Sequence, residues 1–177
     1  RKVQPSGPYQ LMGSSYGGVI AFEIARQLKA VGDEVQLLVM LDSFAPGFRK
    51  PASLRGWISH LRRELSRFVP RRMPTRNSSP AEWDKLRVYA RSEAERRYHP
   101  TALQGDGLLI KAREAVEFPG YIIDPNLGWG PLFDGRLRIY EVPGDHLGIL
   151  APPNVSELAA TLRSHLDKEH WQTEKKE

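Results

Sequence analysis

The sequence predicts an α/β protein whose mostly parallel sheet is flanked by helices. A short apolar strand, Tyr9–Met12, leads through a turn into a helix-patterned stretch from Val19 to Val31. Directly after that helix comes Val35–Leu41, an apolar run typical of a parallel strand buried on both faces. Strand patterns return at Gly107–Ala112 and Arg136–Val142. Strand, helix and strand make a β-α-β unit, which places successive strands side by side.

The turn after the first strand has the pattern G-x-S-x-G, from Gly13 to Gly17, with Ser15 at its apex. The glycines let strand and helix pass close together, and a strained apex residue lifts its hydroxyl above the sheet. The next helix begins below Ser15, so its free N–H groups face any negative charge that forms there. Between a strand and a helix, this pattern is the nucleophile elbow of α/β-hydrolases. It predicts a nucleophilic Ser15 rather than an ordinary turn.

The elbow helix is apolar over most of its surface, which predicts that it is sandwiched against the sheet. Gly32 stands where a left-handed residue ends a helix. The last helix, Asn154 to Leu166, has Asn154 as the expected N-cap. Its expected buried positions are Val155, Leu158, Ala159, Leu162 and Leu166. We expect the tail from His165 onward to be frayed.

No strand pattern occurs between Arg49 and Ala102, where helices are expected at Leu54–Phe68 and Pro80–Tyr98 with a Pro/Arg/Ser-rich linker between them. We therefore divide the chain into hydrolase core (1–48), helical lid insertion (49–103) and hydrolase core (104–177). From Arg49 to Pro100 there are 14 Lys/Arg against 5 Asp/Glu. Such a segment suits an acidic protein, nucleic acid or membrane surface, or is simply the solvated face of amphipathic helices.

The composition excludes several classes of protein. The 177 residues contain no cysteine, which excludes disulfides, thiolate metal sites and a cysteine nucleophile. No apolar run reaches the length of a membrane span, and the N-terminus is no signal peptide. We expect a cytoplasmic setting. The first residue is Arg1 rather than Met, so a piece of a longer chain is expected.

Serine catalysis needs a base and a carboxylate that holds the base in the right tautomer. Ser15, Asp42 and His146 occur in the hydrolase chain order, each just past the end of an expected strand. The other histidines lie in the insertion (His60, His99) or on the terminal helix and tail (His165, His170). Glu114, Glu117 and Asp124 follow a later strand and remain rival acids, whereas Asp145 is expected to shape the histidine loop.

An oxyanion hole needs two backbone N–H groups aimed at the developing negative oxygen. Tyr16, the residue after the nucleophile, is the expected first donor. The second should come from a loop after an earlier strand, and only eight residues precede the first strand here. We therefore expect that the second donor and the opening strands lie outside this chain.

Two stretches resemble the thioesterase domains that end nonribosomal peptide and polyketide synthases. One is the elbow and its helix, from Gly7 to Leu28, with Leu41-Asp42-Ser43 after the next strand. The other runs from Val142 through Gly144-Asp145-His146 to Pro153-Asn154-Val155. Ser14 departs from the pattern, because relatives carry a larger aromatic residue or histidine there. The resemblance implies Ser15 as nucleophile, His146 as base and Asp42 rather than Glu114 as acid.

By this resemblance, Ser15 takes a peptidyl or polyketide chain from the phosphopantetheine arm of an acyl or peptidyl carrier protein. Water or a nucleophile within the chain then releases it, by hydrolysis or macrocyclisation. No cofactor or metal of its own is expected, nor a nucleic-acid or membrane partner, and the basic insertion would face the acidic carrier. The alternatives are a lipase- or esterase-like carboxylester hydrolase and a non-catalytic carrier-docking module.

Overall fold

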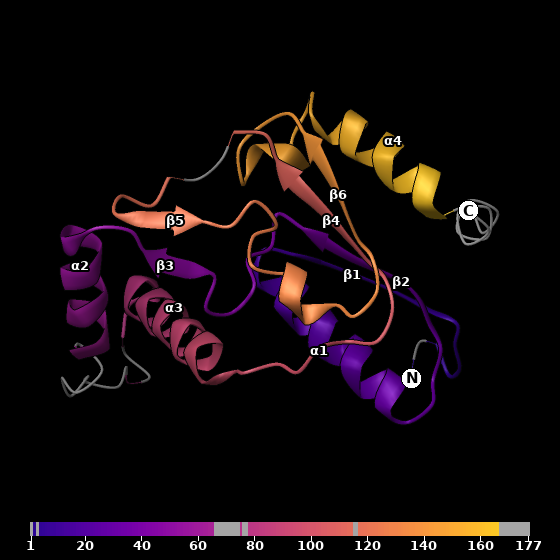
Figure 1. Ribbon diagram of the computed structural model, residues 1–177, viewed down its shortest axis with the longest axis horizontal. Coiled ribbons are helices and arrows are strands. Elements are labelled where there is room, and N and C mark those ends of the chain that lie inside the picture. The colour runs from indigo at the N-terminus through magenta and orange to yellow at the C-terminus, as the bar shows by residue number, and fades with distance from the viewer. Residues whose placement is uncertain (1, 3, 66–74, 76–77, 115–116, 167–177) are drawn as a thin grey trace.

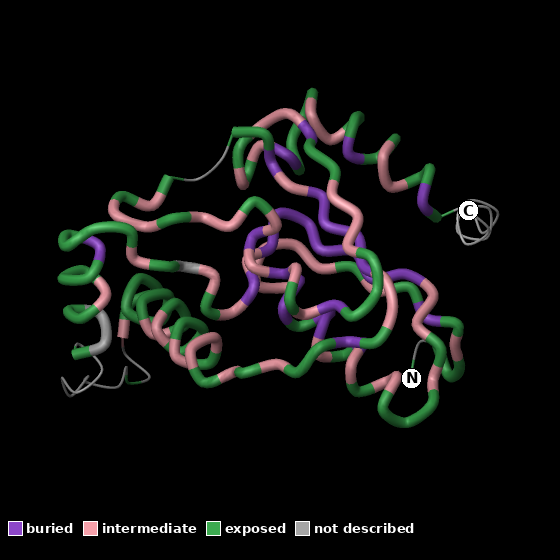
Figure 2. Tube along the Cα trace, in the orientation of Figure 1, coloured by how far each residue is buried: buried purple, intermediate pink, exposed green. Residues whose placement is uncertain are grey.

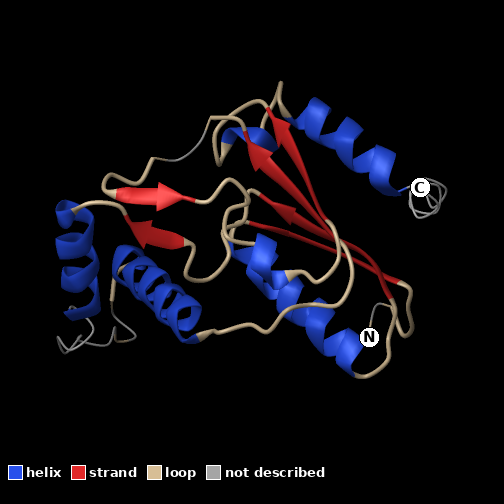
Figure 3. Cartoon of the chain, viewed as in Figure 1, coloured by secondary structure: helices blue, strands red, loops and turns tan. Residues whose placement is uncertain are grey.

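Four parallel strands form the centre of the molecule. The computed structural model describes residues 2, 4–65, 75, 78–114 and 117–166. The sheet consists of β1 (Tyr9–Ser14), β2 (Val35–Leu41), β4 (Gly107–Ala112) and β6 (Leu137–Val142), in the order β1-β2-β4-β6. All three strand pairs are parallel (Figure 3). The predicted parallel sheet is confirmed.

The sheet carries one apolar cluster on each face, because alternate residues of a strand point to opposite sides. Leu38 and Met40 of β2 pack with Phe22 of α1 (Tyr16–Ala30). Leu37, Val39 and Leu41 pack on the other side, in the cluster that holds Leu158 of α4 (Val155–Leu166). Figure 2 shows buried residues concentrated along the central strands. Two short 3₁₀ turns, Gly130–Leu132 and Gly148–Leu150, complete the core.

The outer side of β1 is exposed in the described part of the chain. Within the described residues β1 pairs only with β2, so it is an edge strand. Met12 is 58% exposed, and Ile20 and Ile24 of the elbow helix are 49% and 42% exposed. The predicted packing of α1 against the sheet is found on the side that carries Phe22, whereas the described residues do not cover the side that carries Ile20 and Ile24. Gly32 ends α1 as predicted, with φ +83°.

The helical insertion contains α2 (Leu54–Leu65) and α3 (Pro80–Arg97). It also contains β3 (Arg49–Pro51), a strand that the sequence did not predict. This strand pairs antiparallel with β5 (Tyr121–Ile123). Three-residue strands are too short to show an alternating pattern. In Figure 1, α2, α3, β3 and β5 gather on one side of the molecule, away from α4. Most of the expected linker between the helices, and the end of the first helix beyond Leu65, lie outside the described residues.

Besides the β3–β5 pairing, side-chain and packing contacts at both helices connect residues 49–103 to the rest of the chain. Gly56 of α2 packs on Gly120 before β5, where a Cβ on Gly56 would lie 1.9 Å from the Gly120 carbonyl oxygen. At the end of α3, the Tyr98 hydroxyl donates a hydrogen bond to the Glu23 carboxylate on α1. Arg26 donates two more to the same carboxylate, at 2.8 and 2.7 Å. α3 itself has no buried residue, so the contacts at its end, rather than burial of its side chains, hold this helix against the core.

The terminal helix differs in detail from its predicted pattern. Leu158 is buried as expected and Val155 and Leu162 are half-buried, but Ala159 and Leu166 are exposed. His165, expected in a frayed tail, is buried against the Tyr140 ring at a centroid distance of 4.8 Å. Asn154 directly precedes the helix, and its side-chain amide donates to the Gly148 carbonyl. No helix in the described part of the chain has both the length and the hydropathy needed to cross a bilayer.

The Glu23 cluster predicts a pH dependence of stability. Hydrogen bonds from Arg26, and next from Tyr98, outweigh burial and lower the pKa of Glu23 to about 2. A carboxylate with a lowered folded-state pKa stabilises the fold above its unfolded pKa of about 4.3, and this stabilisation is lost as pH falls towards 2. Glu23→Gln should lower the free energy of unfolding at neutral pH by about 1 kcal/mol or less. The deficit should shrink in denaturant titrations near pH 2.

Glu34→Gln, at an exposed carboxylate before β2, is the control and should show no such trend. A Glu23→Gln deficit that grows on acidification would contradict the predicted role of the ionised carboxylate.

Candidate active site

The elbow holds Ser15 in a backbone conformation that side chains rarely adopt, with φ 53° and ψ −126°. Close packing below it requires two glycines. A Cβ on Gly13 would lie 2.0 Å from the Gly17 carbonyl oxygen, and one on Gly18 would lie 2.3 Å from the Ser43 hydroxyl oxygen. A Cβ on Gly17 would meet nothing within 4 Å. The close packing that was predicted to require a glycine at position 17 therefore requires it at position 18 instead.

The elbow is tied to the neighbouring strand, because the Ser15 N–H donates to the Leu41 carbonyl at 2.9 Å. Tyr16 is the first residue of α1, so its N–H has no acceptor within the helix. That free donor directly follows the nucleophile, as an oxyanion hole requires. The Tyr16 role stays a prediction, and so does a second donor from elsewhere.

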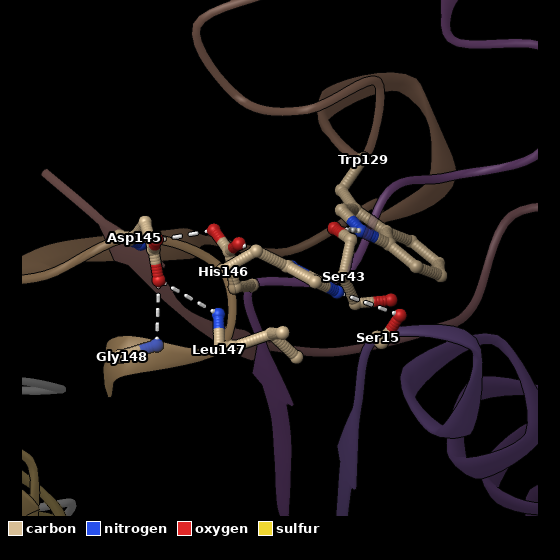
Figure 4. A network of polar contacts seen from close by, with 9 residues as sticks. Ser15, Ser43, Trp129, Asp145, His146, Leu147 and Gly148 are labelled. Atoms are coloured by element: carbon tan, nitrogen blue, oxygen red, sulfur yellow. Dashed lines mark hydrogen bonds and ion pairs between the residues drawn. The ribbon is translucent and has the colours of Figure 1, made fainter. Parts of the chain in front are cut away.

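The three predicted site residues lie in hydrogen-bond contact. His146 Nε2 is 3.0 Å from Ser15 Oγ, a contact drawn in Figure 4, and His146 Nδ1 is 2.6 Å from Asp42 Oδ2. Because the carboxylate accepts a hydrogen bond from Nδ1–H, the Nε2 lone pair faces the serine hydroxyl. This is the tautomer that a general base for Ser15 needs.

Asp42 is held from two sides. Its side chain is buried, and Oδ1 accepts a hydrogen bond from the Ala112 N–H at the end of β4, at 2.9 Å. Its own N–H donates to the Ile110 carbonyl at 2.7 Å. Its φ of 39° is left-handed, a conformation that aspartate tolerates better than most residues. Both oxygens are therefore used, one by the sheet and one by the base.

The rival carboxylates are engaged elsewhere or point to solvent. Glu114 and Glu117 are exposed, and Asp124 Oδ1 accepts hydrogen bonds from the N–H groups of Asn126 and Gly128. Within the described ranges, Asp42 is the one carboxylate in hydrogen-bond contact with His146. The geometry therefore favours Asp42 over the three residues that the sequence left open.

Asp145 shapes the histidine loop, as predicted. Its Oδ1 accepts hydrogen bonds from the N–H groups of Leu147 and Gly148, at 3.1 and 2.7 Å (Figure 4). Gly144 has φ +101°, and a Cβ there would lie 2.5 Å from the Asn154 side chain. The loop that carries His146 is thus bent by glycine and pinned by two polar side chains.

Trp129 contacts the segment next to Asp42, a contact that could not be predicted from the sequence. Its indole is fully buried, and Nε1–H donates to the Ser43 carbonyl at 2.7 Å (Figure 4). The Ala45 N–H donates to the Leu127 carbonyl at 2.9 Å. The loop that carries Trp129 therefore makes two hydrogen bonds to the segment just after Asp42. The only sequence signal was a tryptophan in a loop, and the partner 86 residues away becomes known only from the fold.

A cavity of about 800 Å³ opens above Ser15 and His146, between the core and α3. His60 and His99 also line it, with the His60 ring edge-on to Trp57 and His99 Nδ1 lying 2.9 Å from the Arg97 carbonyl oxygen. Across the described residues, no group of three or more His, Cys, Asp or Glu side chains is arranged to hold a metal ion. The arrangement suits nucleophilic attack by Ser15 on an acyl group bound in this cavity, with His146 as the base.

Comparison with known proteins agrees with this geometry. The model of the family described as thioesterase domain matches residues 1–166. The chain is 28% identical over 181 residues to the vanchrobactin synthetase VabF of Vibrio anguillarum, covering 94% of this chain and 6% of that protein. It is also 28% identical over 204 residues to the non-reducing polyketide synthase atnG of an Arthrinium species, covering 95% of this chain and 10% of that protein.

Among solved structures, the NocB thioesterase domain in covalent complex with a fluorophosphonate nocardicin G analog is similar to this chain. The TM-score is 0.62 at 29% identity, over 94% of this chain and 69% of that one. The likeness confirms the predicted α/β-hydrolase fold. The chain spans a small fraction of the length of the synthases that it matches.

The Trp129 hydrogen bond predicts a positioning role that is separable from packing. Trp129→Phe keeps an aromatic ring in the core but removes the N–H that holds the Ser43 carbonyl, so Asp42 and His146 should lose alignment. A neutral hydrogen bond contributes about 1 kcal/mol, so we expect roughly fivefold slower labelling of Ser15 by a fluorophosphonate. Labelling rates are followed by intact-protein mass spectrometry across pH.

Phe133→Leu, in the same core cluster but without this hydrogen bond, is the matched control. It should lower the melting temperature and leave the labelling rate of folded protein unchanged. Equal labelling by Trp129→Phe and wild type would show that the indole only fills space.

Proposed function

The chain belongs to the thioesterase domain family, and on that basis we propose that it releases an acyl chain from a thioester through an acyl-enzyme on Ser15. The acyl group would be a peptidyl or polyketide chain carried on the phosphopantetheine arm of a carrier protein. The observation that carries the proposal is the continuous contact from Ser15 Oγ to His146 and on to Asp42.

In the first step, Ser15 Oγ attacks the thioester carbonyl while His146 Nε2 takes the hydroxyl proton. Asp42 stabilises the imidazolium that forms, and the Tyr16 N–H stabilises the negative oxygen of the tetrahedral intermediate. The carbon–sulfur bond then breaks, and His146 returns the proton to the leaving sulfur. The products are an ester on Ser15 and the free thiol of the carrier arm.

In the second step, His146 takes a proton from water or from a nucleophile within the acyl chain. That nucleophile attacks the Ser15 ester, the bond to Oγ breaks, and His146 returns the proton to Oγ. Water gives an acid, and an internal nucleophile gives a macrocycle. Every proton is moved by His146, so the chemistry calls for no metal or cofactor of this chain.

We further propose that residues 49–103 act as a lid between core segments 1–48 and 104–177. The α3 residues Arg91, Ser92 and Glu95 line the cavity opposite Ser15, which supports this division. Arg55 and Arg62 are exposed on α2 and suit an acidic carrier protein, whereas Arg71 and Arg72 lie outside the described residues. The absence of cysteine fits the cytoplasmic setting that we propose.

A Ser–His–Asp site is equally suited to oxygen esters, and family membership is what favours thioesters. Ser15→Ala should abolish turnover of an N-acetylcysteamine thioester, a small mimic of the carrier arm, and should abolish fluorophosphonate labelling. Ser14→Ala is the neighbouring control and should retain both. A label found on Ser14 or Ser43 would refute the assigned nucleophile, and faster turnover of the matched oxygen ester would favour a carboxylester hydrolase.

The acid is tested separately. Asp42→Asn should leave the fold intact and lower kcat by roughly 10⁴-fold, because the amide favours the wrong histidine tautomer. Glu114→Gln, on an exposed side chain, should change kcat little. Steady-state kinetics with circular dichroism on both variants distinguish a lost acid from a lost fold, and the reverse order of effects would place the acid on the later strand.

A further inference from the structure

The cavity above Ser15 has two chemically different walls. One is aromatic and consists of Phe44, Phe48 and Phe118. The other is polar and comes from α3, with Arg91, Ser92, Glu95 and Arg96. Leu132 and Pro131 also line the cavity, but the phenylalanines are its one cluster of stacked aromatic rings among the described residues. An acyl chain attached to Ser15 would lie between the two walls, and the phenylalanine side can cover an aromatic part of it.

The three phenylalanine rings form one surface. The Phe44 and Phe48 centroids are 4.4 Å apart at an interplanar angle of 33°, and Phe118 stands edge-on to Phe44 at 5.9 Å and 89°. Phe118 is 5.7 Å from Phe48 at 69°. The aromatic wall therefore offers both ring faces and ring edges to whatever lies beside it.

This wall begins next to the catalytic base. The Phe44 centroid is 6.4 Å from the His146 imidazole, and Phe44 follows Asp42 by two residues. Phe48 packs closely on Gly128, because a Cβ on that glycine would lie 2.8 Å from the Phe48 Cβ. The rings thus stand where the first atoms of an acyl chain beyond the carbonyl would lie.

The rings are not simply part of the core. Phe22 and Phe133, which pack with Trp129 beneath the sheet edge, are 0% and 7% exposed. Phe44, Phe48 and Phe118 are each half-buried and line the cavity. Rings that serve packing alone are covered by the protein, and these leave part of their surface to the cavity.

The opposite wall is built for polar contacts. The Arg91 guanidinium lies 5.9 Å from the centroid of the Tyr16 ring, and its Nε is 3.9 Å from Glu95 Oε1, a long ion pair. Arg96 is bound to Glu93. A hydrocarbon chain against this wall would displace water from charged groups without replacing their contacts, which is unfavourable.

We propose that the acyl group on Ser15 carries an aromatic ring close to its carbonyl, and that this ring lies against Phe44, Phe48 and Phe118. Aromatic rings gain from offset and edge-to-face contacts beyond their buried area, which a saturated ring of the same size does not. This proposal rests on the thioesterase function proposed above and names its substrate class.

The test compares N-acetylcysteamine thioesters of 3-phenylpropanoate and 3-cyclohexylpropanoate, which differ only in the aromaticity of the ring. Aromatic pair contacts amount to roughly a 2- to 10-fold preference each, so kcat/KM of the wild type should favour the phenyl substrate by that factor or more. Phe48→Leu and Phe118→Leu, which keep apolar volume without a ring, should bring the ratio close to one, mainly by slowing the phenyl substrate.

Phe48→Tyr keeps the ring and should keep the preference. If only the leucine variant loses the preference, the loss is due to the missing ring and not to substitution at this position as such. Trp83→Leu, on a partly exposed aromatic of α3 outside the cavity, should leave the ratio at its wild-type value. Equal kcat/KM for the two thioesters in the wild type, or a preference that survives both leucine variants, would overturn the aromatic subsite.

Fluorophosphonate labelling separates this outcome from failure of the proposed function. If Ser15 is labelled and both thioesters turn over at equal rates, the site is a thioesterase without an aromatic subsite. If Ser15 is not labelled in folded wild type, the proposed function itself is wrong, and the proposed aromatic subsite is rejected as well. Calorimetric binding of 3-phenylpropanoate and 3-cyclohexylpropanoate to Ser15→Ala gives a second measure of the preference, independent of turnover.

Discussion

The arrangement of the site depends on the hydrogen bonds of the Asp42 carboxylate. One oxygen accepts a hydrogen bond from the end of β4 and the other from His146, whose loop follows β6. Asp42 directly follows β2, and the Ser15 N–H is bound to the carbonyl of Leu41, the last residue of that strand. Asp42 and Leu41 together therefore connect groups from all four strands. They can do so because parallel strands deliver their carboxyl ends to one edge of the sheet.

The parts of the fold that could be predicted from sequence were those set by local pattern. The elbow, the β-α-β unit and the strand before His146 each carry glycines or apolar runs that have one physical interpretation. The order of Ser15, Asp42 and His146 then followed from the chain order of the hydrolase site. Strand positions alone left Asp42, Glu114, Glu117 and Asp124 open, and only the resemblance favoured Asp42. The contact distances in the structure agree with that choice.

What could not be predicted depends on pairs of distant residues. β3 and β5 are three residues long and exist because they pair with each other across 70 residues. The Trp129 hydrogen bond and the aromatic wall likewise join segments that nothing in their own neighbourhood connects. The burial of His165 was missed for the opposite reason, since its helical position looked polar and terminal.

The left-handed backbone at Ser15 sets function against stability at a single position. A non-glycine residue in such a conformation costs about 1–3 kcal/mol, and that cost is present whether or not substrate is bound. Glycine would adopt the same angles without this penalty but has no hydroxyl. Selection for stability alone would therefore favour glycine at this position, so a strained serine here fits the nucleophilic role that we propose for Ser15.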